Sequence, residues 1–250
     1  MTETTEDGFL GGTLTVEQPA RGYRAGIDPV LLAAAVPALS GESVLELGTG
    51  VGTAILCLAH RVPGLELVAV ERHQELAGLA RRNLDRNGIE AQVVTADLAD
   101  MPELVKGRHF DHVIANPPFF DRQKGSEAVA RDREGGRGED TPLALWIDTA
   151  IRRLRPKGRL TVIQRSDRLP DLLSAVEARL GDIRILPICG RQGRPCETLI
   201  LTGRKGTKGA LKLLSPFVLH EGDRHDGDRD SYRPAARAIL RDAGALPPLD

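Results

Sequence analysis

Two short segments of this 250-residue sequence combine residue types that could do chemistry, and the first spans residues 46–52. It reads Glu46-Leu47-Gly48-Thr49-Gly50-Val51-Gly52 and follows an apolar run. Its glycines allow a tight turn and a close approach of the backbone to a ligand, beside the N-terminus of the next helix. A dinucleotide site calls for Gly-x-Gly-x-x-Gly, and Thr53 stands at the third glycine position. Such a turn is often only a turn, but this pattern fits a ligand that lacks a pyrophosphate.

Two acidic residues follow at the ends of the next predicted strands. Glu71 ends the second strand and suits the two hydroxyls of a ribose. Asp97 comes just after the third strand, where its carboxylate could accept a hydrogen bond from an adenine amino group. Each could be an ordinary loop acid. Together with the glycine turn, they predict a crevice for a nucleoside-like ligand at the carboxyl edge of a sheet.

The second segment is Asn116-Pro117-Pro118-Phe119, which follows the fourth predicted strand. Prolines have no N–H and a fixed φ, so the Pro117 carbonyl is rigidly aimed, and the Asn116 side-chain oxygen offers a second acceptor nearby. The Phe119 ring offers a face on which a planar group can stack. In isolation these residues could be a proline-rich strand exit with a core phenylalanine. Beside the glycine turn, they predict a site that grips a planar amino group.

The elements that must position these residues alternate along the chain. Strands are expected at 43–47, 66–70, 91–95, 110–115 and 158–164, with a late pair at 183–189 and 197–202. Helices are expected at 52–60, 73–87, 142–154, 169–180 and 234–243, and a short one over 30–39 follows Asp28 as N-cap. Nearly continuous apolar strands between helices predict a parallel α/β sheet that is covered on both faces.

The chain divides into a central domain, 29–203, an N-terminal extension, 1–28, and a C-terminal extension, 204–250, that packs on the same domain. The N-terminal extension is polar and is expected to be extended or only locally ordered. Residues 121–140 are rich in charge and glycine, which is typical of a mobile surface loop.

Composition limits the classes of partner. The sequence has 34 Lys+Arg against 35 Asp+Glu and a formal net charge of -1, so any RNA contact must use a local basic patch such as residues 151–168. No apolar run reaches the roughly 18 residues of a membrane span, and no signal peptide is visible. The three cysteines, Cys57, Cys189 and Cys196, form no CxxC pair, and the six histidines lack metal-ligand spacing. No metal and no disulfide scaffold are expected, Cys189 and Cys196 are expected to be inert, and a cytoplasmic location is favoured.

At the glycine turn and the two acids, the sequence resembles class I S-adenosylmethionine-dependent methyltransferases. The resemblance implies a Rossmann-like, seven-stranded, mainly parallel sheet with S-adenosyl-L-methionine as cofactor. Glu46, Gly48, Gly50 and Gly52 would then hold the methionine end. Glu71 would hold the ribose, Asp97 and the Leu98 backbone the adenine, and Asn116 would also lie against the cofactor.

The second segment resembles the [N/D]PP[Y/F] signature of methyltransferases that act on amino nitrogens. By this resemblance Asn116, Pro117, Pro118 and Phe119 are the catalytic residues. A nitrogen conjugated to a ring is a poor nucleophile because its lone pair is delocalised. Two acceptors gripping its hydrogens would favour a pyramidal nitrogen and direct the lone pair at a methyl-sulfonium group. The catalysis is then orientation and preorganisation, with no strong general base.

Three acceptors share this motif: adenine N6, guanine N2 and the glutamine side-chain amide. Residues 22–28, the Asn-Pro-Pro-Phe segment, and the motifs at 219–221 and 238–241 resemble the bacterial enzymes that methylate adenine N6 in the anticodon loop of a valine tRNA. That resemblance implies tRNA as partner and a flipped base in the pocket. The alternatives are an rRNA guanine-N2 methyltransferase, a protein glutamine methyltransferase and a non-catalytic module that binds cofactor or RNA.

Overall fold

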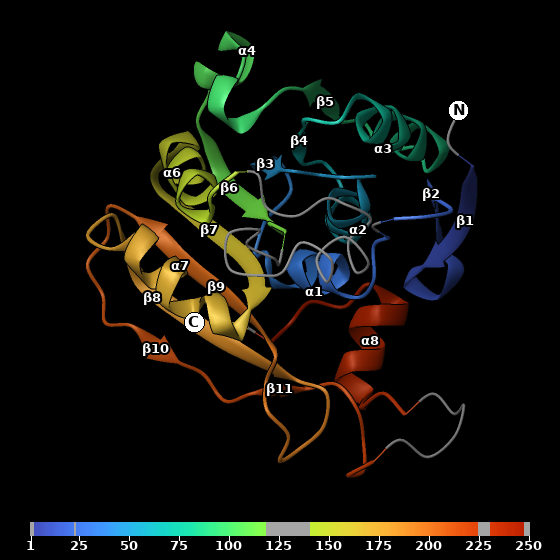
Figure 1. Cartoon of the computed structure of the whole chain (residues 1–250), viewed down its shortest axis with the longest axis vertical. Coiled ribbons are helices and arrows are strands. Elements are labelled where there is room, and N and C mark those ends of the chain that lie inside the picture. The colour runs from blue at the N-terminus through green and yellow to red at the C-terminus, as the bar shows by residue number, and fades with distance from the viewer. Residues whose placement is uncertain (1–2, 23, 119–140, 225–230, 248–250) are drawn as a thin grey trace.

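A computed structural model describes residues 3–22, 24–118, 141–224 and 231–247 (Figure 1). Its centre is a sheet in the order β10-β8-β9-β7-β6-β3-β4-β5, and β11 also pairs with β8. The strands are parallel except β9, which is antiparallel to both β7 and β8. The mainly parallel, Rossmann-like α/β sheet expected from the sequence is confirmed.

The strands that carry the expected sheet are β3 (Ser43–Leu47), β4 (Glu66–Glu71), β5 (Gln92–Thr95), β6 (Phe110–Ala115), β7 (Leu154–Arg165), β8 (Leu180–Cys189) and β9 (Thr198–Lys205). The helices are α1 (Asp28–Ala35), α2 (Thr53–Arg61), α3 (Gln74–Arg86), α4 (Glu103–Lys106), α6 (Leu143–Arg153), α7 (Leu169–Val176) and α8 (Pro234–Asp242). Short 3₁₀ turns lie at η1 (Leu10–Gly12), η2 (Leu98–Asp100) and η3 (Ser166–Arg168).

Alternating strand residues divide the core into two layers. Val44 of β3 packs with α1, α2, α3 and α8 on one face of the sheet. Leu45 and Leu47 of the same strand pack with α4, α6 and α7 on the other face. Because both faces of the central strands are covered, their side chains are apolar on both sides, as the sequence predicted.

The expected count of seven strands is wrong, because the described residues alone form a sheet of nine. After β9 the chain returns along the open edge of β8. There β10 (Lys212–Leu213) pairs with Arg184–Ile185, and β11 (Phe217–Val218) pairs with Ile188–Cys189. Each added strand is two residues long, which is too short to produce a hydrophobic alternation in the sequence.

Several predicted boundaries also need correction. Asp28 was expected as an N-cap, but it is the first residue of α1, it makes no side-chain capping bond, and Ile27 is the cap. This helix ends at Ala35 instead of residue 39, since Pro37 disfavours a helical conformation at Val36. Helix α7 ends at Val176, and the left-handed Ala178 (φ 58°) turns the chain into β8 before the expected end at 180.

The N-terminal segment is an ordered hairpin of β1 (Thr4–Phe9) and β2 (Leu14–Pro19), which packs beside α3 (Figure 1). Asn83 of α3 fixes it: its Oδ1 accepts from the Glu17 N–H at 2.8 Å, and its Nδ2 donates to the Glu17 carbonyl at 3.0 Å. The same Nδ2 donates to the Val51 carbonyl at 2.9 Å. A fully buried amide therefore ties the hairpin to the turn that follows β3.

Candidate functional site

A cavity opens at the carboxyl edge of the sheet, over the ends of β3, β4, β5 and β6. Its walls include most of the residues singled out from the sequence: Glu46, Gly48, Gly50, Glu71, Leu98, Asn116, Pro117 and Pro118. Gly52 and Asp97 do not line it, and Phe119 lies outside the described residues. The two predicted segments, far apart in the sequence, thus share one cavity.

The three glycines of the turn, Gly48, Gly50 and Gly52, have different surroundings. All have positive φ values, of 66° at Gly48, 58° at Gly50 and 89° at Gly52. A Cβ on Gly50 would meet no atom within 4 Å, so this glycine leaves open space beside the cavity. A Cβ on Gly52 would make only an ordinary contact with Ala80 at 3.5 Å, so the left-handed backbone is what favours glycine at this position.

Trp146 of α6 covers the remaining glycine. A Cβ on Gly48 would lie 2.3 Å from the Trp146 Cη2 atom, so only glycine allows the indole to pack here. Trp146 lines the cavity and is 8% exposed. It was not predicted as a site residue. The available signal was a lone tryptophan inside an amphipathic helix, which is equally typical of a core residue.

Glu46 is buried at the end of β3 and holds the glycine turn. Its Oε2 accepts from the Thr49 hydroxyl at 2.6 Å and from the Ile55 N–H at 3.2 Å. Burial raises the pKa of its carboxyl to about 8, and the nearby Glu71 charge acts in the same direction. Glu46 therefore carries a proton at neutral pH and joins the turn to the start of α2.

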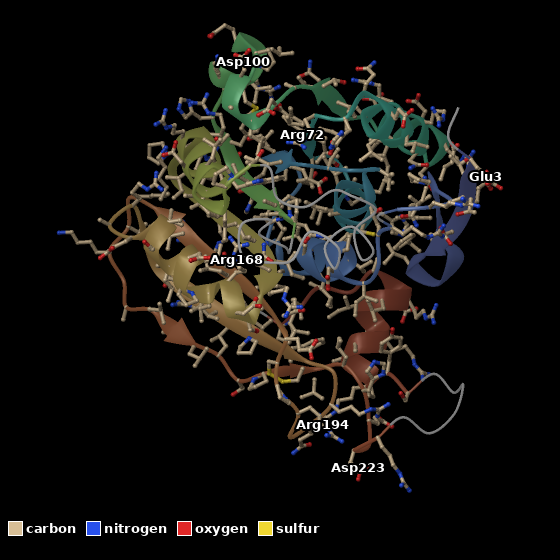
Figure 2. The ribbon with its side chains drawn as sticks, in the orientation of Figure 1. Glu3, Arg72, Asp100, Arg168, Arg194 and Asp223 are labelled. Atoms are coloured by element: carbon tan, nitrogen blue, oxygen red, sulfur yellow. A yellow bond between two sulfur atoms is a disulfide. The ribbon has the colours of Figure 1, made fainter. Side chains whose placement is uncertain are left out.

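Glu71 ends β4 and binds the same turn from the other side. Its Oε2 accepts from the Gly50 N–H at 2.9 Å, and its Oε1 accepts from the His73 N–H at 2.8 Å. A carboxylate has about four acceptor positions, so two are left for further hydrogen bonds. Arg72 follows at the wall of the cavity and is labelled in Figure 2.

Asp97 does not line the cavity. It is exposed, and its carboxylate accepts from the Ala99 N–H at 2.8 Å, which caps the short 3₁₀ turn that begins at Leu98. Leu98 itself lines the cavity. The contact of Asp97 with an adenine stays a prediction.

The Asn-Pro-Pro segment leaves the end of β6, next to β3, and lines the same cavity as the glycine turn. Asn116 and Pro118 are half-buried and Pro117 is buried. The side chain of Gln164, at the end of the neighbouring strand β7, donates to the carbonyls of Pro117 and Pro118 at 3.3 and 3.4 Å. Gln164 was missed by sequence reasoning. Its only signal was a polar residue in an apolar strand.

Other candidates have structural explanations. Arg24 donates to the Thr5 hydroxyl at 2.6 Å and pairs with Asp7, so it anchors the N-terminal hairpin. Tyr23 lies outside the described residues. Cys189 and Cys196 form a disulfide, which corrects the expectation that they are inert. The reason is spatial: β8 and β9 are antiparallel neighbours, so the cysteines that flank their turn meet.

Within the described ranges, no cluster of His, Cys, Asp and Glu could hold a metal ion. No helix in that part of the chain is both long and apolar enough to cross a membrane. Basic residues of 151–168 and 191–212 are partly used in internal contacts. Arg155 pairs with Asp111, and Arg194 donates to the Asp223 carbonyl at 3.5 Å, at the foot of Figure 2.

The geometry agrees with what comparison finds. The model of one protein family, the methyltransferase small domain, matches residues 26–186. The chain belongs to this family. It is therefore an S-adenosylmethionine-dependent methyltransferase, and the enzyme class and cofactor expected from the sequence are confirmed.

Relatives of this methyltransferase have more specific names. A protein of Porphyromonas gingivalis, named tRNA1(Val) (adenine(37)-N6)-methyltransferase, is 34% identical over 187 residues, which are 69% of this chain and 72% of the relative. A Haemophilus influenzae protein of the same name is 26% identical over 219 residues, 86% of this chain and 91% of its own.

Solved structures support the fold. A predicted O-methyltransferase from Agrobacterium tumefaciens superposes with a TM-score of 0.70 at 25% identity, over 88% of this chain and 98% of that chain. A Thermus thermophilus 16S rRNA N2 G1207 methyltransferase, in complex with AdoMet and guanosine, superposes with a TM-score of 0.57 at 23% identity. That match covers 81% of this chain and 50% of the other, and it shows the fold alone.

Proposed function

We propose that this methyltransferase methylates an exocyclic amino nitrogen, and that its substrate is adenine N6 in the anticodon loop of a tRNA. The observation that carries the proposal is the presence of Asn116, Pro117 and Pro118 in one cavity with the glycine turn. The names of relatives that align with most of this chain support the choice of adenine and of tRNA.

The cavity residues fit S-adenosylmethionine. The missing Cβ of Gly50 leaves a cradle that a side chain would fill, and Glu71 retains acceptor positions for ribose hydroxyls. Glu46, Gly48 and Gly50 would hold the methionine end, with Gly52 supporting the turn, and Asp97 and the Leu98 backbone would hold the adenine. When bound, the cofactor supplies an electrophilic methyl group on a sulfonium.

The Asn-Pro-Pro segment, residues 116–118, is called the proline turn below, and it would hold the substrate amino group. The Pro117 carbonyl and the Asn116 side-chain oxygen accept its two hydrogens, and Phe119 stacks on the base. These contacts direct the nitrogen lone pair toward the methyl group. S-adenosylmethionine would supply the methyl group to this nitrogen as its S–C bond breaks, and the residues of the segment would hold the nitrogen while one of its protons leaves for solvent. Because no general base is needed, orientation accounts for the rate.

An RNA substrate requires contacts with phosphates as well. Exposed arginines are candidates for these contacts, such as Arg152 of α6, whose side chain is 69% exposed, and Arg194, which is labelled in Figure 2. Binding through such residues would weaken as salt rises. An unstacked anticodon-loop base would then be flipped into the cavity. Action on tRNA would place the enzyme in the cytoplasm, and this location is part of the proposal.

The test is transfer of labelled methyl from S-adenosylmethionine to unmodified tRNA, ribosomal RNA and protein in parallel, followed by analysis of the modified residues. N6-methyladenosine in tRNA is the expected product. N2-methylguanosine or methylglutamine would keep the chemistry and overturn the adenine assignment. Absence of label from all three acceptors, with cofactor binding confirmed by calorimetry, would overturn the proposed substrate class and favour a binding-only module.

A further inference from the structure

Gln164 lies where the catalytic segment leaves the sheet. Strand β7 runs beside β6 (Figure 1), with Ala115 opposite Val162, so the register brings Gln164 to the sheet edge beside Pro117. Its neighbours on β7, Val162 and Ile163, belong to the two apolar core layers. Gln164 is itself fully buried. A buried amide costs free energy unless it is hydrogen-bonded, so its partners matter.

The orientation of the amide is determined by its surroundings. The Arg165 backbone N–H donates to the Gln164 Oε1 at 2.8 Å. A backbone N–H can only donate, so the oxygen must face it and the NH₂ group must face the other way. There the Nε2 meets two acceptors, the carbonyls of Pro117 at 3.3 Å and of Pro118 at 3.4 Å.

The proline turn depends on such a donor. Neither Pro117 nor Pro118 has a backbone N–H, so neither can donate to an adjacent strand. Their carbonyls are the only backbone groups through which hydrogen bonds can fix them. One side chain therefore anchors both residues.

We propose that Gln164 is a positioning residue that sets the direction of the Pro117 carbonyl toward the substrate amino group. This inference rests on the proposed function. A carbonyl oxygen has two lone pairs, so Pro117 can accept from Gln164 and from the substrate nitrogen together. Loss of the donor frees the carbonyl to turn away from the nitrogen, while the glycine turn is unchanged.

The first test is Gln164→Met, which keeps the length of the side chain and removes both donors. We expect kcat to fall about 10- to 100-fold, as small misplacements of reacting groups do. The dissociation constant for S-adenosylmethionine should change less than about twofold, because Gln164 hydrogen-bonds to Pro117, Pro118 and Arg165, which all lie outside the glycine turn. Wild-type kcat in this variant would overturn the inference.

The second test is Gln164→Glu, which adds a pH signature. An ionised glutamate accepts only and repels both carbonyls, whereas the protonated acid can donate to one of them. Burial raises the pKa of such a carboxyl. The kcat of this variant should therefore rise as the pH falls, relative to that of the wild type. A constant ratio across the pH range would overturn the inference, since a purely structural defect gives no such rescue.

Thr161→Val is the matched control. Thr161 lies on the same strand, is fully buried, and its hydroxyl has no hydrogen-bond partner within the described part of the chain. The kcat of Thr161→Val should equal that of the wild type. Equal losses of kcat in Thr161→Val and Gln164→Met would mean that kcat depends only on the packing of β7. That result would contradict the proposal. Inactive wild-type enzyme on all acceptors would contradict the proposed function instead, so the two failures can be told apart.

Discussion

The glycine turn and the proline turn follow neighbouring parallel strands, β3 and β6, at the same edge of the sheet. The hydrogen bonds that fix their backbones nevertheless run in opposite directions. Backbone N–H groups of the glycine turn and of α2 donate to two glutamates, Glu46 and Glu71. Backbone carbonyls of the proline turn accept from an amide, Gln164. Buried carboxyl groups therefore fix the glycine turn, and a buried amide donor fixes the proline turn.

This difference indicates that the two turns have different functions. The glycine turn makes room and offers acceptors for a ligand with hydroxyl and amino groups. The proline turn presents carbonyl oxygens whose directions are held by hydrogen bonds from Gln164. Changes in the first turn should alter cofactor binding and folding, and changes in the second should alter turnover.

The largest expected effect is on the proline turn. Asn116→Ala removes one of two acceptors for the amino group, and loss of a preorganised hydrogen-bonding partner typically lowers kcat by about 10²- to 10³-fold. The dissociation constant for S-adenosylmethionine should change only a few-fold. Single-turnover methyl transfer and calorimetry measure the two quantities. Loss of cofactor binding equal to the loss of turnover would break the division between the two turns.

The next effect is on the glycine turn. Gly48→Ala puts a Cβ 2.3 Å from the Trp146 ring, and overpacking of this kind costs about 1–3 kcal/mol of unfolding free energy. Gly50→Ala has similar left-handed strain but no clash, so it is the control. It should unfold at a higher temperature than Gly48→Ala and still bind cofactor less well than the wild type. Equal melting temperatures would contradict this packing argument.

A smaller effect is expected at Glu71. In Glu71→Gln, the amide NH₂ must face one of the two N–H groups that the carboxylate now accepts. We expect cofactor affinity to fall about tenfold, in line with the loss of a charge-assisted hydrogen bond, with kcat unchanged at saturating cofactor. Glu66→Gln, at the exposed start of the same strand, should behave as wild type. A lowered kcat in Glu71→Gln alone would assign this carboxylate a role in turnover.

The last effect concerns Glu46 and the pH dependence of stability. Its folded pKa is about 8, raised by burial from a model-peptide value of 4.5, so the folded state holds this proton more tightly than the unfolded state. The stability it contributes is complete below pH 4.5 and is lost as the pH rises through about 8. Glu46→Gln should unfold at the same temperature as the wild type near pH 5 and at a higher one near pH 8.5. Parallel stability profiles for the two proteins would falsify this assignment.

The elements that carry the site could be predicted because their signals are local. Strand 110–115 and the turn after β3 follow from apolar runs and glycine spacing, and the sheet edge that joins them follows from parallel topology. The helix expected at 73–87 was predicted for the same reason: α3 ends at Arg86, with Asn87 as its C-cap and the left-handed Gly88 after it.

Two of the contacts that were missed join residues far apart in the sequence. Gln164 meets Pro117 across 47 positions of sequence, and Glu17 meets Asn83 across 66. No spacing rule connects such pairs. The two-residue strands β10 and β11 and the Cys189–Cys196 disulfide depend likewise on which strands become neighbours in space.

Trp146 is the single tryptophan of the chain, and it packs on Gly48 at the wall of the cavity. Intrinsic fluorescence excited at the red edge of indole absorption therefore comes from one place in the molecule. Cofactor entering beside Gly48 should change the emission of this indole without any attached dye. The protein thus contains its own optical titration signal, and affinities of every variant of the glycine turn that keeps Trp146 can be read from it.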